Sequence, residues 1–154
     1  MLFRSIFLLF LSSFLFYAFF TLDTRASAAI KENSRNKVIK INERLFIAQT
    51  NDIYMNAEDY LGKTISYEGI YKTINNEDSG EILHFVIRYG PGCCAYDAEA
   101  GFEVIWDKEW PQDNDWCEVT GVLEEYKADG QPFLRLALTS LKVLKKRGME
   151  RVKM

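Results

Sequence analysis

The chain has 154 residues, of which 48% are hydrophobic and 27% charged, which is typical of one globular domain. Residues 29–141 carry 20 acidic and 11 basic side chains, whereas residues 142–154 carry six basic side chains and one acidic. An acidic region repels phosphate backbones, so we expect no nucleic-acid partner. The basic end could contact anionic lipid, but we expect it to be a solvated terminus.

The N-terminus has the pattern of a secretory signal. A nearly unbroken apolar run covers residues 5–22, and Ala26 and Ala28 then offer the small residues that signal peptidases recognise. We expect residues 1–28 to be a signal peptide cut after Ala28. The alternative is an uncleaved anchor contacting the membrane through residues 5–22, because about 18 apolar residues is near the lower limit of a span. Either way, the rest is predicted to be secreted or extracytoplasmic, with residues 29–37 as a polar linker.

A short strand and one helix are predicted next. Residues 38–42 alternate like a strand, and residues 43–61 carry side chains at helical spacing that could face a core. These side chains are Phe46, Thr50, Ile53, Ala57 and Tyr60. Asn51 and Asn56 are weak helix formers, so the helix can be broken in its middle. Gly62 follows, where helices commonly end.

After Gly62 the apolar period changes to two, which indicates β-strands. The alternating segments are residues 64–73, 81–89, 101–107, 117–127 and 131–144. Turn-forming residues separate them, with Asn, Asp and Gly at 75–80 and a hairpin tip at 128–130. The alternation slips at Thr139–Ser140, which predicts a β-bulge or bend.

The predicted fold is mainly β with one N-terminal helix. We expect a small five-stranded OB-like barrel, with a small β-sandwich as the alternative. Glycines inside two of the strands suit a strongly curved barrel. The helix of an OB-fold usually lies between the third and fourth strands, whereas here it precedes the barrel. Residues 38–146 form the predicted domain, and residues 147–154 a basic C-terminal tail.

The candidate site is the stretch "RYGPGCCAYDAEAG" at 88–101, which holds adjacent cysteines. Cys93, Cys94 and Asp97, with His84 nearby in sequence, offer ligands suited to zinc or another thiophilic metal. Neighbouring residues of a regular strand point to opposite faces, although the Gly-Pro-Gly break relaxes that objection. Cys-Cys-x-x-Asp is also not a common zinc spacing. A lone His on a strand is more often a partly exposed sheet residue.

Two other interpretations of the cysteines stay open. Export favours disulfides, and strained ones suit redox roles, so Cys93 and Cys94 could pair with each other or with Cys117. Alternatively the two cysteines only pack a tight turn. Cys117 alternates in phase with Val119 and Leu123, so we expect it to be a small core residue.

With these residues in view, the chain resembles the C-terminal extracytoplasmic domain of YcgQ-like bacterial membrane proteins, a permease-associated family of unknown function. The resemblance covers roughly residues 38–145. Its most specific part is a Phe-Val-x-Arg strand followed by Cys-Cys-x-x-Asp-Ala, here Phe85, Val86, Arg88, Cys93, Cys94, Asp97 and Ala98. Weaker matches are Tyr60, Gly62, Lys63, Glu68, Gly69 and the strand at 115–123. The chain departs from the family in its single N-terminal apolar segment and in Cys117, where the family has an apolar residue.

The resemblance implies an envelope location and a membrane permease-like partner, with a suspected link to metal homeostasis but no established activity. The leading hypothesis is a binding module of the cell envelope that holds a soft metal through Cys93 and Cys94. The first alternative is a structural or interaction domain for a membrane partner, with the cysteines oxidised or packed. The second is a thiol-redox protein. We assign no catalytic residue, because the chain has a single His and lacks the Gly-x-Ser-x-Gly motif of serine hydrolases.

Overall fold

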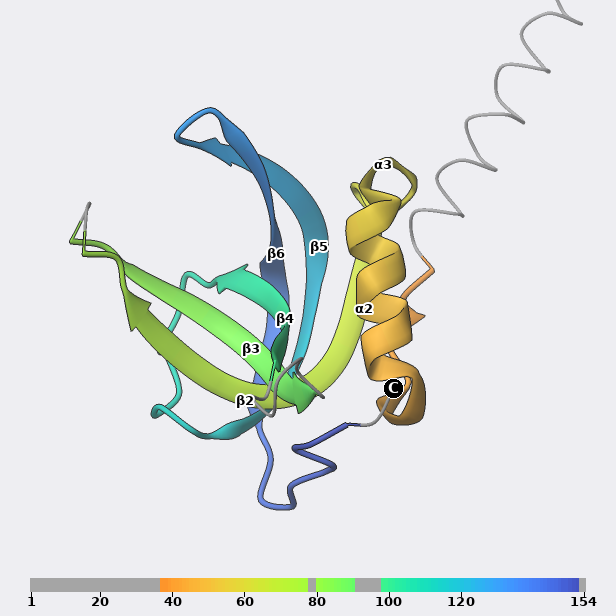
Figure 1. The fold of residues 1–154 in the computed structure, drawn as a ribbon. Coiled ribbons are helices and arrows are strands. Elements are labelled where there is room, and N and C mark those ends of the chain that lie inside the picture. Colours follow the sequence, from red (N-terminus) through yellow and green to blue (C-terminus); the bar gives the residue numbers. More distant parts are fainter. Residues whose placement is uncertain (1–36, 78–79, 91–97, 153–154) are drawn as a thin grey trace, which may run out of the picture. The chain divides into compact units, whose positions relative to one another are not determined.

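The computed structural model describes residues 37–77, 80–90 and 98–152, and shows two short helices followed by strongly bent strands (Figure 1). The elements in chain order are β1 (Ile39–Lys40), the 3-10 helix η1 (Glu43–Leu45), α2 (Phe46–Met55), α3 (Ala57–Tyr60), β2 (Thr64–Asn75), β3 (Ile82–Gly90), β4 (Ala98–Ile105), β5 (Trp116–Ala128) and β6 (Gln131–Val143). The signal or anchor predicted for residues 1–28 lies outside the described residues.

Five of the strands close into a barrel. The sheet order is β1-β2-β3-β4-β6-β5, and β2 also pairs with β5, which joins the two ends. All pairings within the barrel are antiparallel except β4 with β6. β1 is an additional short strand parallel to β2. The predicted five-stranded OB-like barrel is therefore confirmed, and the sandwich alternative is not formed. The helix precedes the barrel, as the sequence pattern predicted.

Close approaches and one bulge give the barrel its curvature. β2 pairs with β5 through residues 64–70 and with β3 through residues 70–75, so one strand serves both halves. Gly69 lies at this crossing, where a Cβ atom would come within 2.7 Å of the Ile87 carbonyl oxygen. In β6 the register jumps from Ser140 to Leu138, which leaves Thr139 as an extra residue. This is the bulge that the slipped alternation predicted.

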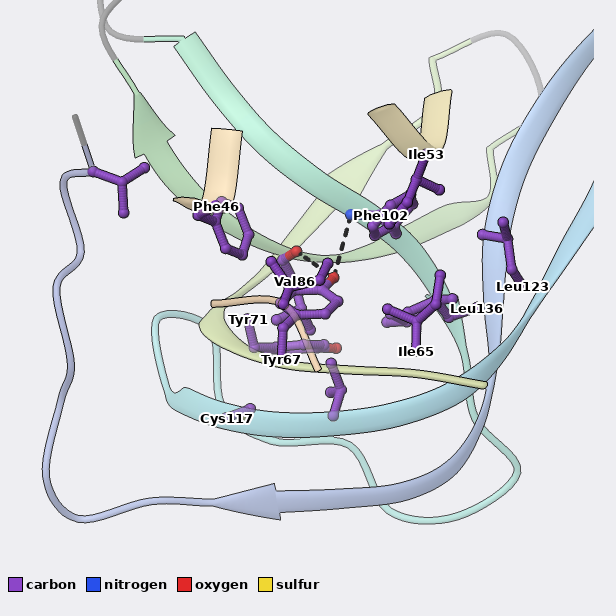
Figure 2. Close-up of a cluster of buried hydrophobic side chains, with 14 residues drawn as sticks. Phe46, Ile53, Ile65, Tyr67, Tyr71, Val86, Phe102, Cys117, Leu123 and Leu136 are labelled. Atoms are coloured by element: carbon purple, nitrogen blue, oxygen red, sulfur yellow. Dashed lines mark hydrogen bonds between the residues drawn. The ribbon is translucent and has the colours of Figure 1, made fainter. Parts of the chain in front are cut away.

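The barrel interior is filled by aromatic and branched side chains around Tyr67 (Figure 2). Tyr67 is 1% exposed. Its hydroxyl donates a hydrogen bond to the Val86 carbonyl at 2.8 Å and accepts one from the Phe102 amide at 3.2 Å. Because both backbone groups belong to adjacent strands, one phenol links β2, β3 and β4 from inside. Burial raises the pKa of Tyr67 far above its ordinary value.

The helical segment packs onto this core through its predicted stripe. Phe46, Thr50 and Ile53 are buried. The Phe46 ring meets Tyr67 edge-on at 5.6 Å between centroids. The helix breaks at Asn56, whose φ of −120° is not helical, so α2 and α3 are separate. The break that the weak helix formers predicted is therefore present, at the later of the two asparagines.

The C-terminal residues differ from the expected solvated end. The Val152 amide donates to the Tyr89 carbonyl at 2.8 Å, and the Tyr89 amide donates to the Glu150 backbone carbonyl at 2.9 Å. Val152 is only 2% exposed and belongs to the core cluster. Lys145, Lys146 and Arg147 are exposed, as a solvated run would be. The sequence pattern concealed the packing because a single apolar residue among charges carries no period.

Candidate functional site

A cleft of about 720 Å³ opens between the β2–β3 hairpin and the β5–β6 hairpin. Figure 1 shows these two hairpins extending from the barrel in different directions. The described residues that line the cleft are Tyr54, Ala57, Asn76, Glu81, Leu83, Phe85, Glu103, Glu125, Tyr126, Ala128, Asp129, Gln131, Pro132, Phe133 and Leu134. OB-folds bind oligonucleotides and oligosaccharides on the face of their second and third strands and between two loops. One of these loops joins the first strand to the second, and the other joins the fourth to the fifth.

The shortness of β4 leaves strand edges open beside this cleft. β4 pairs with β3 only from Phe85 onward and with β6 only from Arg135 onward. Residues 82–84 of β3 pair with β2 alone, and residues 131–134 of β6 pair with β5 alone. Among the described residues, both stretches therefore have one edge without a strand neighbour. Such edges present backbone donors and acceptors that another extended chain can use.

The cleft has apolar walls on both hairpins. Leu83 and Phe85 lie on β3, and Phe133 and Leu134 lie on β6. Phe133 is 47% exposed, although its ring lies 5.7 Å from that of Tyr126 on the neighbouring strand. Large apolar side chains that stay this exposed in a concave surface are typical of binding sites.

The β5–β6 hairpin holds its wall in place with a tight turn. Asp129 and Gly130 have φ values of 50° and 77°, and two consecutive positive φ values are what a two-residue type I′ turn requires. The hairpin tip predicted at 128–130 is therefore confirmed. Because this turn matches the twist of the strands, it fixes their register out to Ala128 and Gln131.

The charged groups of the lining are all acidic. They are Glu81, Glu103, Glu125 and Asp129, and no Lys or Arg occurs among the described lining residues. The Tyr126 hydroxyl donates a hydrogen bond to Glu103. Partial burial and this carboxylate raise the pKa of Tyr126 to about 12, so the phenol remains a neutral donor at physiological pH. Arg135, outside the lining, places its guanidinium 4.8 Å from the Tyr126 ring centroid.

Most of the predicted metal ligands fall outside the described residues. Cys93, Cys94 and Asp97 belong to this group, so the soft-metal hypothesis stays a prediction. Among the residues that the structure does describe, no group of three or more His, Cys, Asp and Glu side chains could hold a metal ion.

His84 has partners of its own within the barrel wall. Its ring stacks on Trp110 with 3.8 Å between centroids, and its Nδ1 atom lies 2.6 Å from the Tyr71 hydroxyl. Partial burial lowers the pKa of His84. His84 is six residues before Gly90, the last residue of β3, which corresponds to about 20 Å along a strand. The role of His84 as a metal ligand therefore stays a prediction, like that of the two cysteines.

Cys117 is confirmed as a core residue. It is 0% exposed, carries a free thiol and packs in the same cluster as Tyr67 (Figure 2). Burial and the nearby Asp115 carboxylate raise the pKa of Cys117 to about 11. A neutral, enclosed thiol is a poor nucleophile and a poor metal ligand, so this position suits packing.

Arg88, a residue of the strand motif, forms a buried junction. It is 3% exposed. Its guanidinium donates to the Glu68 carbonyl at 2.6 Å, to the Glu43 carboxylate at 2.9 Å and to the Met149 carbonyl at 3.0 Å. The Trp116 ring lies 4.9 Å from its centre. One side chain thus ties the N-terminal segment and the C-terminal end to β2.

The sequence contained a signal for the burial of Arg88 but none for the cleft. Arg88 alternates in phase with Val86, which is fully buried, so the motif placed an arginine on the core face of a strand. The acidic residues of the cleft lie far apart in the sequence, at 81, 103, 125 and 129. Their shared cleft depends on β4 being short, which local periodicity does not reveal.

The fold defines this chain as an OB-like barrel domain with a cleft between two hairpins. The family described as DUF1980 C-terminal domain matches residues 17–150, and the chain belongs to that family. The resemblance to YcgQ-like proteins is compatible with this membership. No curated protein and no solved structure matched the chain. Within the described part of the chain, no helix is long and apolar enough to span a membrane.

Proposed function

We propose that this domain is a binding module of the cell envelope and that it holds its ligand in the cleft between the β2–β3 and β5–β6 hairpins. The observation that carries the proposal is the cleft of about 720 Å³ with its partly exposed aromatic wall. Cavities of this size accommodate a small ligand or several residues of an extended chain.

The envelope location in this proposal rests on the sequence. The apolar run at 5–22 and the small residues after it have the pattern of a secretory signal or anchor. A domain held near the membrane could meet a permease-like partner there, and the cleft would then be the surface that receives it.

Metal binding through Cys93, Cys94 and Asp97 is a separate proposal with its own measurement. Native mass spectrometry of the full chain, purified without chelator, should show the added mass of one zinc or copper ion. That mass should disappear in a Cys93→Ser, Cys94→Ser variant. A protein lighter by the mass of two hydrogens would instead indicate a disulfide, and three free thiols without metal would contradict both ideas.

The cleft can be tested without knowing its ligand. The full chain would be screened by NMR against a mixed panel of short peptides, oligosaccharides and nucleotides. We expect at least one class to shift resonances of the cleft residues and to bind more weakly to a Phe133→Ser variant. Val143→Ser is a matched control, because Val143 is also on β6 and is 54% exposed but does not line the cleft. Binding that shifts only residues elsewhere would contradict the proposal, as would a panel with no binder.

A further inference from the structure

We infer that the cleft receives an extended polypeptide segment that carries Lys or Arg side chains among apolar ones. This inference rests on the proposed function and specifies the chemistry of the ligand. It follows from three properties of the same cleft: the sign of its charges, the nature of its walls and the open strand edges beside it.

The charges favour a cationic ligand. Four carboxylates, from Glu81, Glu103, Glu125 and Asp129, line the cleft, and no described lining residue is basic. Charges of one sign in a concave surface with low-dielectric walls attract ligands of opposite sign and repel those of the same sign. Two of the carboxylates, Glu125 and Asp129, are on exposed positions of the β5–β6 hairpin, where a flexible cationic side chain can reach them.

The walls and edges favour an extended polypeptide. Side chains of an extended chain alternate between two faces, so apolar residues can contact Phe85 and Phe133 while basic residues point toward the carboxylates. The edge at residues 82–84 of β3, which has no strand neighbour among the described residues, offers backbone hydrogen bonds to such a chain. Adding a strand to an exposed sheet edge is a common mode of peptide recognition. On β6, Pro132 lacks an N–H, so β3 provides the better edge.

Other ligand classes match fewer of these features. Nucleic acid would bring phosphates against four carboxylates, which is unfavourable. A neutral oligosaccharide could stack on the aromatic wall, but it has no charge to complement the acidic lining and cannot pair with a strand edge. A cationic polypeptide uses the lining charges, the apolar walls and the edge together.

The test uses the full chain in a neutral detergent and three fluorescein-labelled octapeptides. The first alternates Lys and Val, the second alternates Glu and Val, and the third is the Lys-Val peptide with N-methyl groups on alternate amides. Affinities would be measured by fluorescence anisotropy at low and high salt. The charge variant is Glu125→Gln with Asp129→Asn, in which Asn tolerates the positive φ of position 129. The control is Asp107→Asn with Glu109→Gln, which removes the same charge outside the cleft lining.

We expect the Lys-Val peptide to bind and the Glu-Val peptide not to bind. The charge variant should weaken the first peptide about tenfold, the effect of losing two exposed charge pairs, whereas the control should leave its affinity unchanged. High salt should weaken binding because exposed charge pairs are screened. N-methylation should weaken binding by a similar factor, since it removes donors that pair with the strand edge.

Four results would overturn the inference. Equal affinity for the Lys-Val and Glu-Val peptides would contradict the inferred preference for a cationic ligand. An equal loss of affinity for the Lys-Val peptide in the charge variant and the control would contradict it as well. An unchanged affinity after N-methylation would exclude strand addition. If an oligosaccharide binds in the cleft and no peptide does, the proposed binding function stands and this inference falls. Thermal unfolding of each variant would confirm that the comparison is made between folded proteins.

Discussion

The Arg88 junction and the hairpin cleft lie on the same β3 strand but are built in opposite ways. At the junction, a 3% exposed guanidinium is surrounded by oxygen acceptors and aromatic rings. At the cleft, a 47% exposed aromatic ring and several carboxylates remain open to solvent. Since β3 contributes to both, one end of the strand holds the junction together and the other lines the cleft that we propose as the binding site. Mutations at the two ends should therefore separate stability from binding.

The largest expected effect is at the junction. Arg88→Ala should destabilise the fold by about 2–4 kcal/mol, because it leaves the Glu68 and Met149 carbonyls without this donor. It also removes the cationic partner of Glu43, whose carboxylate is 43% exposed and still accepts a hydrogen bond from the Met149 amide. Arg88→Lys should recover only part of this loss, since an ammonium cannot reproduce the fork of donors. Urea unfolding would measure both. Arg135→Ala is the control, because the Arg135 side chain is 30% exposed and its Glu124 partner is 3.6 Å away. A similar loss in both Ala variants would contradict the special role of Arg88.

The second largest effect on stability is expected at the Tyr67 hydroxyl inside the barrel. Tyr67→Phe keeps the ring but leaves the Val86 carbonyl and the Phe102 amide without their partner. An unsatisfied buried polar group costs about 1–3 kcal/mol, so the midpoint of urea unfolding should fall clearly. Tyr54→Phe is a useful comparison, because Tyr54 donates to the Gly101 carbonyl from a residue that is 47% exposed. Equal stability of Tyr67→Phe and the wild type would show that the barrel does not need this bond.

Local patterns were sufficient to predict the barrel and insufficient to predict its cleft. Alternation in β5 and β6 and the slip at Thr139 follow from neighbouring residues, so they are visible in the sequence. The cleft arises because β4 leaves β3 at Phe85 and joins β6 at Arg135, a long-range choice that no short pattern encodes. The C-terminal docking of Val152 was missed for the same reason. The cysteine hypothesis concerned residues 93, 94 and 97, which lie outside the described residues.

A smaller effect on the free energy of unfolding should depend on pH. It concerns His84 on β3. His84 is the only histidine in the chain. Burial lowers its pKa below the ordinary value of 6.5, although the nearby Glu103 carboxylate opposes this shift. The unfolded chain therefore takes up a proton at a higher pH than the folded chain. Stability is fully present above about pH 6.5 and falls as the pH drops below it.

The measurement compares wild type with His84→Gln, which cannot titrate but can still accept a hydrogen bond from Tyr71. Urea unfolding at pH 7.5 and 5.5 should show a larger loss of stability for the wild type than for the variant. The contribution of the carboxylates is common to both proteins and cancels in the comparison. Equal losses would mean that the stacked His84 ring takes up its proton at its ordinary pKa.

The smallest expected effect on stability is at the cleft. It decides whether the cleft, unlike the Arg88 junction, can be altered without destabilising the fold. Phe133→Ser removes a half-exposed ring, and surface substitutions of this type usually change stability by about 0.5 kcal/mol or less. The same variant should lose ligand binding, because that ring forms one wall of the cleft. If Phe133→Ser instead destabilises the fold as much as Tyr67→Phe, the exposed wall is part of the core, and the cleft would have no separate role in binding.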